Sequence, residues 1–426
     1  MEDLSNSLGN VFDYNGLGLK LFKAGRLEEA SNAFKEELTL NPNHTSAQLN
    51  IAITYWGLKQ RNKALEHIAN ALKTGSHKRN VVWHALLMLE KSGQDLAAIE
   101  VAIDYLQYYD DLEIRAKLEQ ITGKELASIN IEITTYCNLR CKGCDLAILD
   151  SQGLWDSRHM DFEDYQKIID ELPPINMVKI WGIGEPVLHA KLPDMIQYAN
   201  STGKFGNIRI CTNALARKID YYFKLFDLGL SSIQISVDSL DPTIADNLRS
   251  GTNVEKLKTR LRDLAIKFKD RIRINTTVGK TNVGLIPCLL DDLVQLGVVY
   301  VNLAPYQDLG NPSECLTAEE RVWFVDQLPE IRQQFPNLNI SQAPFAPLTD
   351  LCRQPWTRAY VTVDGYVTPC CEISDPKRYN YGNTIQSKFA EVYNGLETNS
   401  WRQKFLVESP PACEGCTTFT LRKKIV

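Results

Sequence analysis

The chain has 426 residues, of which 44% are hydrophobic and 23% are charged, as is usual for a globular protein. The formal net charge of −5 gives no electrostatic reason to expect nucleic acid or a membrane surface as a partner, and no apolar run approaches the ~20 residues of a membrane span. The polar, acidic N-terminus is unlike a secretory signal, so we expect a cytoplasmic protein with reduced thiols. Eleven cysteines in that compartment indicate metal binding or catalysis.

The N-terminal region carries a helical repeat with a period of 34 residues. Ala30, Ala64 and Ala98 recur at this period, and small residues are needed where two helices cross closely. Residues 11–110 resemble tetratricopeptide repeats, whose stacked helix pairs commonly bind peptides. A plain helical bundle is the alternative. We expect a helical repeat domain over residues 1–127.

From residue 128 the pattern changes to an α/β type, in which six β-rich runs alternate with helical runs. Six βα units in series predict a parallel sheet with right-handed crossovers, here a partial (β/α)6 barrel over residues 128–311. The chemistry of such folds lies at the C-terminal ends of the strands. Residues 312–426 are expected to form a helical connector and a small cysteine-rich domain. The predicted strands are SINIEITT, NMVKIWG, GNIRICT, SSIQISVD, RIRINTTV and GVVYVNLA.

Three cysteines follow the first predicted strand in the stretch TTYCNLRCKGCDLA, and no fourth lies nearby. A structural zinc site normally takes four ligands, and a bacterial ferredoxin run supplies a fourth cysteine shortly after the third. Three thiolates on a four-iron cluster leave one iron open to a substrate or cofactor. Three unrelated structural thiols are the remaining alternative. The candidate ligands are Cys137, Cys141 and Cys144.

This C-x3-C-x2-C triplet after the first strand of a βα series resembles the radical S-adenosylmethionine (SAM) superfamily. The resemblance implies a [4Fe–4S] cluster whose open iron binds SAM. It also implies reductive cleavage of SAM to a 5′-deoxyadenosyl radical, which removes hydrogen from a substrate. Members often have an aromatic residue just before the third cysteine. Here that residue is Gly143, which puts the usual ring packing near the adenine in doubt.

Further motifs of the superfamily recur in order at the ends of later strands: WGIGEP, CTNA, ISVDS and NLRSGTN. The resemblance implies that the glycine-rich WGIGEP segment holds the SAM amino group, that Ser236 contacts the ribose and that Arg249 binds the SAM carboxylate. The alternative for WGIGEP is an ordinary glycine turn, that for Ser236 and Asp238 is a hydrogen-bonded surface pair, and that for Arg249 is a solvated charge at a helix end. His189, which follows WGIGEP, is expected to be structural. The expected SAM-binding residues are Gly184, Glu185, Pro186, Thr212, Asn213, Ser236, Asp238 and Arg249.

A second set of cysteines lies near the C-terminus with the spacing C-x17-C-x42-C-x2-C. By spacing alone it would suit either zinc or a complete iron–sulfur cluster. The pattern around it resembles the SPASM domain in its shorter Twitch form, which implies one auxiliary [4Fe–4S] cluster. Cys371 is the alternative to its neighbour as a ligand. The expected ligands are Cys352, Cys370, Cys413 and Cys416.

Three cysteines remain outside both sets. We expect Cys211, on a strand, and Cys288, on an amphipathic helix, to be buried small hydrophobes. Cys315 follows the last predicted strand, at the end where the active site is expected. Some radical SAM peptide epimerases use a thiol as hydrogen-atom donor, so Cys315 is a candidate for that role, with loop packing as the alternative.

The sequence thus predicts a radical SAM enzyme that abstracts hydrogen from an unactivated carbon. The auxiliary cluster would accept the resulting electron or position the substrate, and flavodoxin or ferredoxin would supply the reducing electron. A ribosomal peptide or protein is the favoured substrate, because the repeats offer a peptide-binding surface. Dehydrogenation of a small molecule such as a cyclitol or sugar is the first alternative. A non-catalytic, zinc-binding repeat scaffold is the second.

Overall fold

The computed structural model describes residues 12–106, 108–122, 126–153, 155–307, 312–343, 345, 352, 354–407, 410–413 and 416. The chain separates into two compact units, residues 1–124 and residues 125–426. Among these described residues, no helix is both long and apolar enough to cross a membrane.

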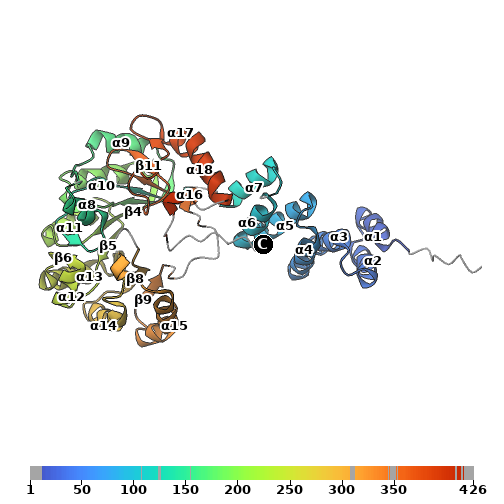
Figure 1. The fold of residues 1–426 in the computed structure, drawn as a ribbon, viewed down its shortest axis with the longest axis horizontal. Helices are drawn as coiled ribbons and strands as arrows, with labels where there is room; N and C mark the ends of the chain where they lie inside the picture. Colours follow the sequence, from blue (N-terminus) through green and yellow to red (C-terminus); the bar gives the residue numbers. More distant parts are fainter. Residues whose placement is uncertain are drawn as a thin grey trace, which may run out of the picture. The chain divides into compact units, whose positions relative to one another are not determined.

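The first unit consists of successive antiparallel helices (Figure 1). The second helix of each pair begins 34 residues after the previous one, at Leu27, Arg61 and Asp95, which matches the period of the sequence. The helices are α1 (Tyr14–Lys23), α2 (Leu27–Leu40), α3 (Thr45–Gly57), α4 (Arg61–Gly75), α5 (Arg79–Lys91), α6 (Asp95–Leu106) and α7 (Leu112–Thr122).

The repeated alanines lie where these helices pack against one another. Ala30, Ala64 and Ala98 each occupy the fourth position of their helix, and each is 0% exposed. A larger side chain at these positions would push the neighbouring helix away and leave voids around it. The helical nature of the N-terminal region is confirmed, whereas its identity as a tetratricopeptide array stays a prediction.

The turn within each helix pair requires a left-handed backbone at one position, which again recurs every 34 residues. Gly25 and Gly93 have φ values of 75° and 72°, and Lys59 takes the same place with φ 60°. We expect Lys59→Gly to raise the free energy of unfolding of this unit by about 1 kcal/mol, because a non-glycine residue pays a steric cost there. Chemical denaturation followed by circular dichroism measures it.

Gly93→Ala is the matched control for that substitution. A Cβ at Gly93 would meet no atom within 4 Å, so its effect would report the backbone conformation alone. We expect a loss of about 1 kcal/mol. A loss of stability in Lys59→Gly would contradict this account of the turns.

The second unit is built on a sheet that has ten strands among the residues the structure describes. Their order is β12-β11-β10-β1-β3-β4-β5-β7-β8-β9, and the pairs from β10 through β1 to β9 are all parallel. The predicted strands are confirmed as β1 (Ser128–Ile131), β3 (Ile175–Ile180), β4 (Phe205–Thr212), β5 (Ser232–Ser236), β7 (Ile272–Val278) and β8 (Tyr300–Pro305).

Residues C-terminal to the expected barrel extend this sheet at both edges. Strand β9 (Asn339–Gln342) adds beside β8, and β10 (Arg358–Val361) adds beside β1. Antiparallel strands β11 (Tyr366–Thr368) and β12 (Gly382–Asn383) follow β10. The α/β fold class is confirmed, and the six predicted strands form the middle of a wider sheet.

Helices cover the outer face of the curved sheet, as Figure 1 shows for α9, α10, α11, α13 and α14. The larger helices of this unit are α8 (Asp145–Ser151), α9 (Phe162–Glu171), α10 (Leu192–Ser201), α11 (Ile219–Asp227), α12 (Pro242–Leu248), α13 (Val254–Phe268), α14 (Ile286–Gln295), α15 (Ala318–Gln334) and α18 (Leu396–Val407). Short α-helices occur at Gln354–Thr357 (α16) and Phe389–Tyr393 (α17). Short 3-10 turns include η1 (Pro186–Leu188) and η4 (Pro312–Glu314).

The two faces of the sheet differ in polarity. Along each strand every second side chain points toward the helices, and these side chains are buried and apolar. They include Ile131, Ile180, Ile210, Ile235 and Ile274. Residues on the opposite, inner face are mostly polar and half-buried, as in the burial patterns of β4 and β7. Strict alternation of this kind puts the core on one face and leaves the other open to a ligand.

Candidate functional site

The three N-terminal cysteines lie in one loop after β1. Cys141 belongs to the short strand β2 (Arg140–Cys141), which pairs with β6 (Arg249–Ser250), and Cys144 is the residue that precedes α8. All three thiols are half-buried, and burial raises the pKa of Cys137 to about 12 and that of Cys144 to about 11. Buried thiols that resist ionisation in isolation are suited to a metal centre that replaces their protons.

Gly143 fits this loop for a specific reason. Its φ is 75°, and an added Cβ would lie 1.6 Å from the hydroxyl oxygen of Tyr306, which follows β8. The aromatic ring beside the cysteines therefore comes from the end of β8 and not from position 143. Sequence reasoning missed Tyr306, because no local pattern links it to a loop more than a hundred residues earlier.

Arg249 lies directly beside the cysteine loop. Its Nε donates to Asp238 at 2.6 Å, and Nη1, one of its two terminal nitrogens, lies 3.6 Å from the sulfur of Cys141. Burial would lower the pKa of Arg249, but Asp238 and Cys141 raise it, and the net shift is upward. A fixed cation at this position favours an ionised Cys141 and an anionic ligand next to it.

The glycine-rich segment after β3 packs against the first strand end. A Cβ on Gly184 would lie 2.3 Å from the carbonyl oxygen of Thr134, so this close approach of two backbones needs glycine. The Glu185 amide donates to the Tyr136 carbonyl at 2.7 Å, and Pro186 begins η1. The segment is thereby held beside the cysteine loop.

Glu185 joins this segment to the end of β4. Its buried carboxylate accepts from the Thr212 hydroxyl at 2.6 Å and from the Asn213 amide at 2.7 Å. The Asn213 side chain in turn donates to Asn138, in the cysteine loop, at 2.9 Å. Asn138 was not predicted. Ala214 has φ 60°, a left-handed conformation that glycine adopts at less steric cost than alanine.

Burial raises the pKa of Glu185 to about 7, against the opposing hydrogen bonds from Thr212 and Asn213. The folded state then holds a proton that the unfolded chain releases near pH 4.5, so stability falls as pH rises toward and past 7. We expect the free energy of unfolding to be about 2 kcal/mol lower at pH 8 than at pH 5.5 from this group alone. Glu185→Gln should remove that part of the pH dependence in urea titrations.

Glu163→Gln, on the exposed face of α9, is the control and should leave the slope of stability with pH unchanged. An unaltered slope in Glu185→Gln would show that the carboxyl titrates normally in the folded protein.

A small pocket adjoins the cysteine loop at the C-terminal ends of β4 and β5. Ser236, Asp238 and Arg249 contribute its polar part, and Asn213 closes one side. Its apolar wall is formed by Leu139, Leu215, Val237, Ala245 and Leu257. The structure thus brings four of the predicted SAM-binding residues to one pocket, while Gly184, Glu185, Pro186 and Thr212 do not line it.

The second cysteine set also gathers in space. The pKa of Cys352 is raised to about 11 by burial and by Cys416, and that of Cys413 to about 12 by burial, Cys416 and Cys352. Cys370 is almost fully buried, and its raised pKa reflects burial first and then Cys371, Glu372 and Cys352. Cys352 is thus linked electrostatically to each of the other three thiols, which indicates that the four lie in one region of the fold.

Cys371 has different surroundings from Cys370. Burial raises its pKa to about 12 and Glu372 adds to this, whereas Lys179 and Arg358 act in the opposite direction. These neighbours lie on the inner face of the sheet. The influence of Cys352 on Cys370 therefore favours Cys370 over Cys371 as a member of the second set.

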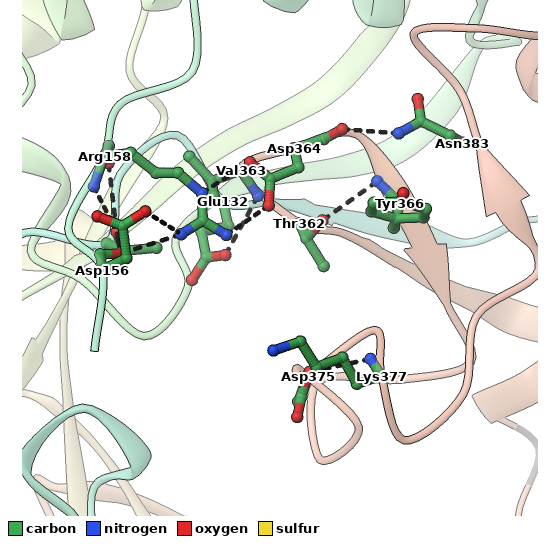
Figure 2. A network of polar contacts seen from close by, with 11 residues as sticks. Glu132, Asp156, Arg158, Thr362, Val363, Asp364, Tyr366, Asp375, Lys377 and Asn383 are labelled. Carbon is green, nitrogen blue, oxygen red and sulfur yellow. Dashed lines mark hydrogen bonds and ion pairs between the residues drawn. The ribbon is translucent and has the colours of Figure 1, made fainter. Parts of the chain in front are cut away.

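A polar network ties the two cysteine regions together, and Figure 2 shows it around Glu132 and Arg158. The buried Glu132 carboxylate accepts from the Ile183 amide at 2.8 Å and from the Val363 amide at 3.2 Å. Arg158 donates through two guanidinium nitrogens to the two carboxylate oxygens of Asp364 (Figure 2). The glycine-rich segment and the β10–β11 hairpin that leads to Cys370 thus share one carboxylate.

Cys315 is half-buried in the loop after β8, next to Glu314. Glu314 accepts from the Lys142 ammonium group at 2.7 Å and from the Thr281 hydroxyl at 2.9 Å. Since Lys142 lies between Cys141 and Cys144, this ion pair holds the Cys315 loop beside the cysteine triplet.

Two predictions about the other cysteines were wrong. Cys288 is exposed, because it lies on the solvent side of α14, whose buried positions are Ile286, Leu289, Leu290 and Leu293. Cys211 is half-buried on the polar face of β4, and its sulfur lies 3.5 Å from the Ser236 hydroxyl. His189 is buried with both ring nitrogens engaged by backbone groups, as the structural interpretation predicted.

The donor set suits the predicted clusters in its chemistry. Soft thiols come together in two sets, one of three beside a pocket and one of four. In the described part of the chain, no group of three or more His, Cys, Asp or Glu side chains surrounds a single metal-ion position. The triplet would hold the SAM-binding cluster, and the second set an auxiliary one.

Comparison with known proteins identifies both regions. Residues 131–283 match the Radical SAM superfamily, and residues 352–417 match the SPASM iron–sulfur cluster-binding domain. Over 311 residues the chain is 23% identical to the "Probable GTP 3′,8-cyclase" of Methanococcus maripaludis. This alignment covers 70% of this chain and 100% of that protein.

Two further relatives differ in their named roles. The "Tungsten-containing aldehyde ferredoxin oxidoreductase cofactor-modifying protein" of Pyrococcus furiosus is 26% identical, over 67% of this chain and 86% of its own. The structure of Streptococcus suis SuiB bound to the precursor peptide SuiA superposes with a TM-score of 0.54 at 15% identity, covering 74% of this chain and 80% of SuiB. That likeness shows a shared fold. The chain therefore carries a Radical SAM domain and a SPASM domain, which together imply a SAM-binding [4Fe–4S] cluster, SAM and auxiliary iron–sulfur clusters.

Proposed function

We propose that this protein removes a hydrogen atom from an unactivated carbon of a ribosomal peptide or protein. The proposal of radical chemistry rests on the cysteine triplet, which lies beside the pocket of Ser236, Asp238 and Arg249. When bound, the cluster and SAM would supply the 5′-deoxyadenosyl radical. The chain's own residues hold and orient these groups.

In this proposal the cysteine triplet, Arg249 and Asp238 have different roles. Cys137, Cys141 and Cys144 would hold the cluster, and Arg249 would stabilise the thiolate form of Cys141 while facing the carboxylate of SAM. Asp238 fixes the guanidinium orientation, because one of its oxygens accepts from Arg249 and the other from the Thr277 amide.

The remaining contacts of the proposal concern the cofactor and the electron. The backbone around Gly184 would accept from the SAM amino group, and Ser236 would bond the ribose. The second cysteine set, with one auxiliary cluster in the Twitch manner, would accept the electron left on the substrate or position it. Flavodoxin or ferredoxin would deliver the initial electron. Cys315, in a loop tied to the triplet, remains a candidate hydrogen donor.

A peptide substrate is favoured by the N-terminal helical repeats. Their 34-residue phase matches that of tetratricopeptide arrays, which commonly bind peptide segments. SuiB, a protein of the same fold, has a crystal structure in which it is bound to its precursor peptide SuiA. A small-molecule substrate, in line with the GTP 3′,8-cyclase relatives, is the second candidate. The family match gives no support to a non-catalytic zinc scaffold.

Deuterium transfer separates the two candidates. Extract of the source organism, grown in deuterated water, is divided by ultrafiltration into a peptide and protein fraction and a small-molecule fraction. Each fraction is added to reconstituted enzyme with SAM and dithionite, and 5′-deoxyadenosine is examined by mass spectrometry. Deuterium from the first fraction, lost after protease treatment, supports a peptide substrate. Deuterium transferred only from the small-molecule fraction would contradict a peptide substrate and support a small-molecule substrate.

A further inference from the structure

Four cationic side chains share the inner face of the sheet: Lys179 on β3, Arg209 on β4, Arg273 on β7 and Arg358 on β10. Lys179 and Arg209 are directly paired across β3 and β4. The register of β4 with β5 and of β5 with β7 places Arg273 on the same face, and the pairing of β10 with β1 places Arg358 there. We call these four residues the inner cation row.

Within the described part of the chain, none of these four side chains forms an ion pair with a carboxylate. Arg209 donates to the Ser232 hydroxyl at 2.9 Å, and Arg273 stacks 4.4 Å from the centre of the Tyr300 ring. The Arg273 Nε is buried and lacks a hydrogen-bond partner among the residues described. Guanidinium donors left unsatisfied in a half-buried place are costly unless a ligand completes them.

The charges of the row also act on one another. Burial lowers the pKa of Lys179 to about 8, with Arg358 and Arg209 contributing in the same direction. The carboxylate of Glu132, on the same face, is already occupied by the backbone amides of Ile183 and Val363. Like charges held together, none of them in an ion pair with a carboxylate in the described part of the chain, favour binding of an anion between them.

The inner cation row lies close to the pocket of Ser236, Asp238 and Arg249, which is proposed to bind SAM. Arg209 is one inward-facing position before Cys211 on β4, and the Cys211 sulfur is 3.5 Å from the Ser236 hydroxyl, which lines that pocket. An anion held by Arg209 would therefore keep an attached carbon chain near the place where hydrogen is removed.

We propose that the inner cation row binds a carboxylate or phosphate group of the substrate and so orients the carbon that loses hydrogen. This inference rests on the proposed function, which it deepens by naming the charge of the substrate. Arg209 and Arg273 act as donors to the oxygens of the anion, since the planar guanidinium fork matches carboxylate and phosphate geometry.

Direct binding tests the row without any need for turnover. Reconstituted full-length protein is titrated calorimetrically, at fixed ionic strength, with tripolyphosphate and with triglutamate. Triglutamine serves as the uncharged probe, and both peptides are acetylated and amidated at their ends. We expect at least one anion to bind and triglutamine not to bind. Arg209→Gln/Arg273→Gln should weaken that binding roughly a hundredfold, since two charged hydrogen-bonding groups are lost.

Lys218→Gln/Arg262→Gln removes two exposed cations, one just before α11 and one on α13, and should leave both binding and 5′-deoxyadenosine formation unchanged. Binding of triglutamate points to an acidic peptide, and binding of tripolyphosphate alone to a phosphorylated small molecule. Thermal unfolding checks that the double variant is folded, and Lys179→Gln, with a weaker expected loss, replaces it if it is not.

Absence of binding by either anion, or equal binding by the row variant and the control, would overturn the proposal. Failure of wild-type protein to form 5′-deoxyadenosine would instead refute the proposed radical function and leave the binding result standing.

Discussion

Cys141→Ala is expected to abolish formation of 5′-deoxyadenosine and to lower the iron content of reconstituted protein from about eight to about four per chain. The substitution removes one of three thiolates and also the partner of the Arg249 guanidinium at 3.6 Å. A three-thiolate cluster has no spare protein ligand, so loss of one should release it. Anaerobic reconstitution, iron and sulfide analysis and a dithionite-driven assay measure both effects.

Cys288→Ala is the matched control, because this thiol is exposed on α14. It should retain full iron content and full 5′-deoxyadenosine formation. If Cys141→Ala kept both as well, the triplet would not hold the reactive cluster. A decrease in Cys288→Ala alone would place the cluster elsewhere.

Cys413→Ala is expected to lower the iron content by about four per chain while reductive cleavage of SAM continues. The reason is that Cys413 is linked electrostatically to Cys352 and Cys416 of the second set and not to the triplet. Transfer of deuterium from the substrate should fall at least about tenfold if, as proposed, the auxiliary cluster accepts the electron or positions the substrate.

Cys371→Ala is the control in the same region. Its neighbours are Glu372, Lys179 and Arg358, so we expect the iron content to be unchanged. Retention of iron in Cys370→Ala with its loss in Cys371→Ala would reverse the assignment of these two neighbours. Unchanged iron in Cys413→Ala would remove the auxiliary cluster from the account.

The strands at the centre of the sheet were predictable because their signals are local. In β4, apolar Ile208 and Ile210 alternate with polar Arg209, and β-branched residues favour the extended chain. The sequence indicated a hairpin before Cys370, but the addition of β9 and β10 to the sheet was not predicted, because it depends on pairing with β8 and β1. A short strand gives no sign in its own sequence of the strand it will join.

The parts of the site that were predictable are those whose residues lie close together in the sequence. The cysteine triplet, Glu185 and Arg249 lie in recognisable segments, and the structure brings them around one loop. Tyr306 and Asn138 were missed, since their contacts with Gly143 and Asn213 join distant segments. The inner cation row was missed for the same reason, because strand register alone brings its members together.

Cys288 shows that an amphipathic pattern alone does not determine which side chains of a helix are buried. The residue lies in an amphipathic segment, but one residue away from the buried stripe of Ile286, Leu289 and Leu293. A helix turns about 100° per residue, so such a small step is enough to expose the thiol.

The most direct test of the central claim is anaerobic reconstitution of the full-length protein with iron and sulfide, followed by incubation with SAM and dithionite. We predict about eight irons per chain, from one cluster in each cysteine set, and formation of 5′-deoxyadenosine. About four irons with product would confine the claim to the triplet and remove the auxiliary cluster. Zinc in place of iron, with no 5′-deoxyadenosine, would contradict the radical function altogether.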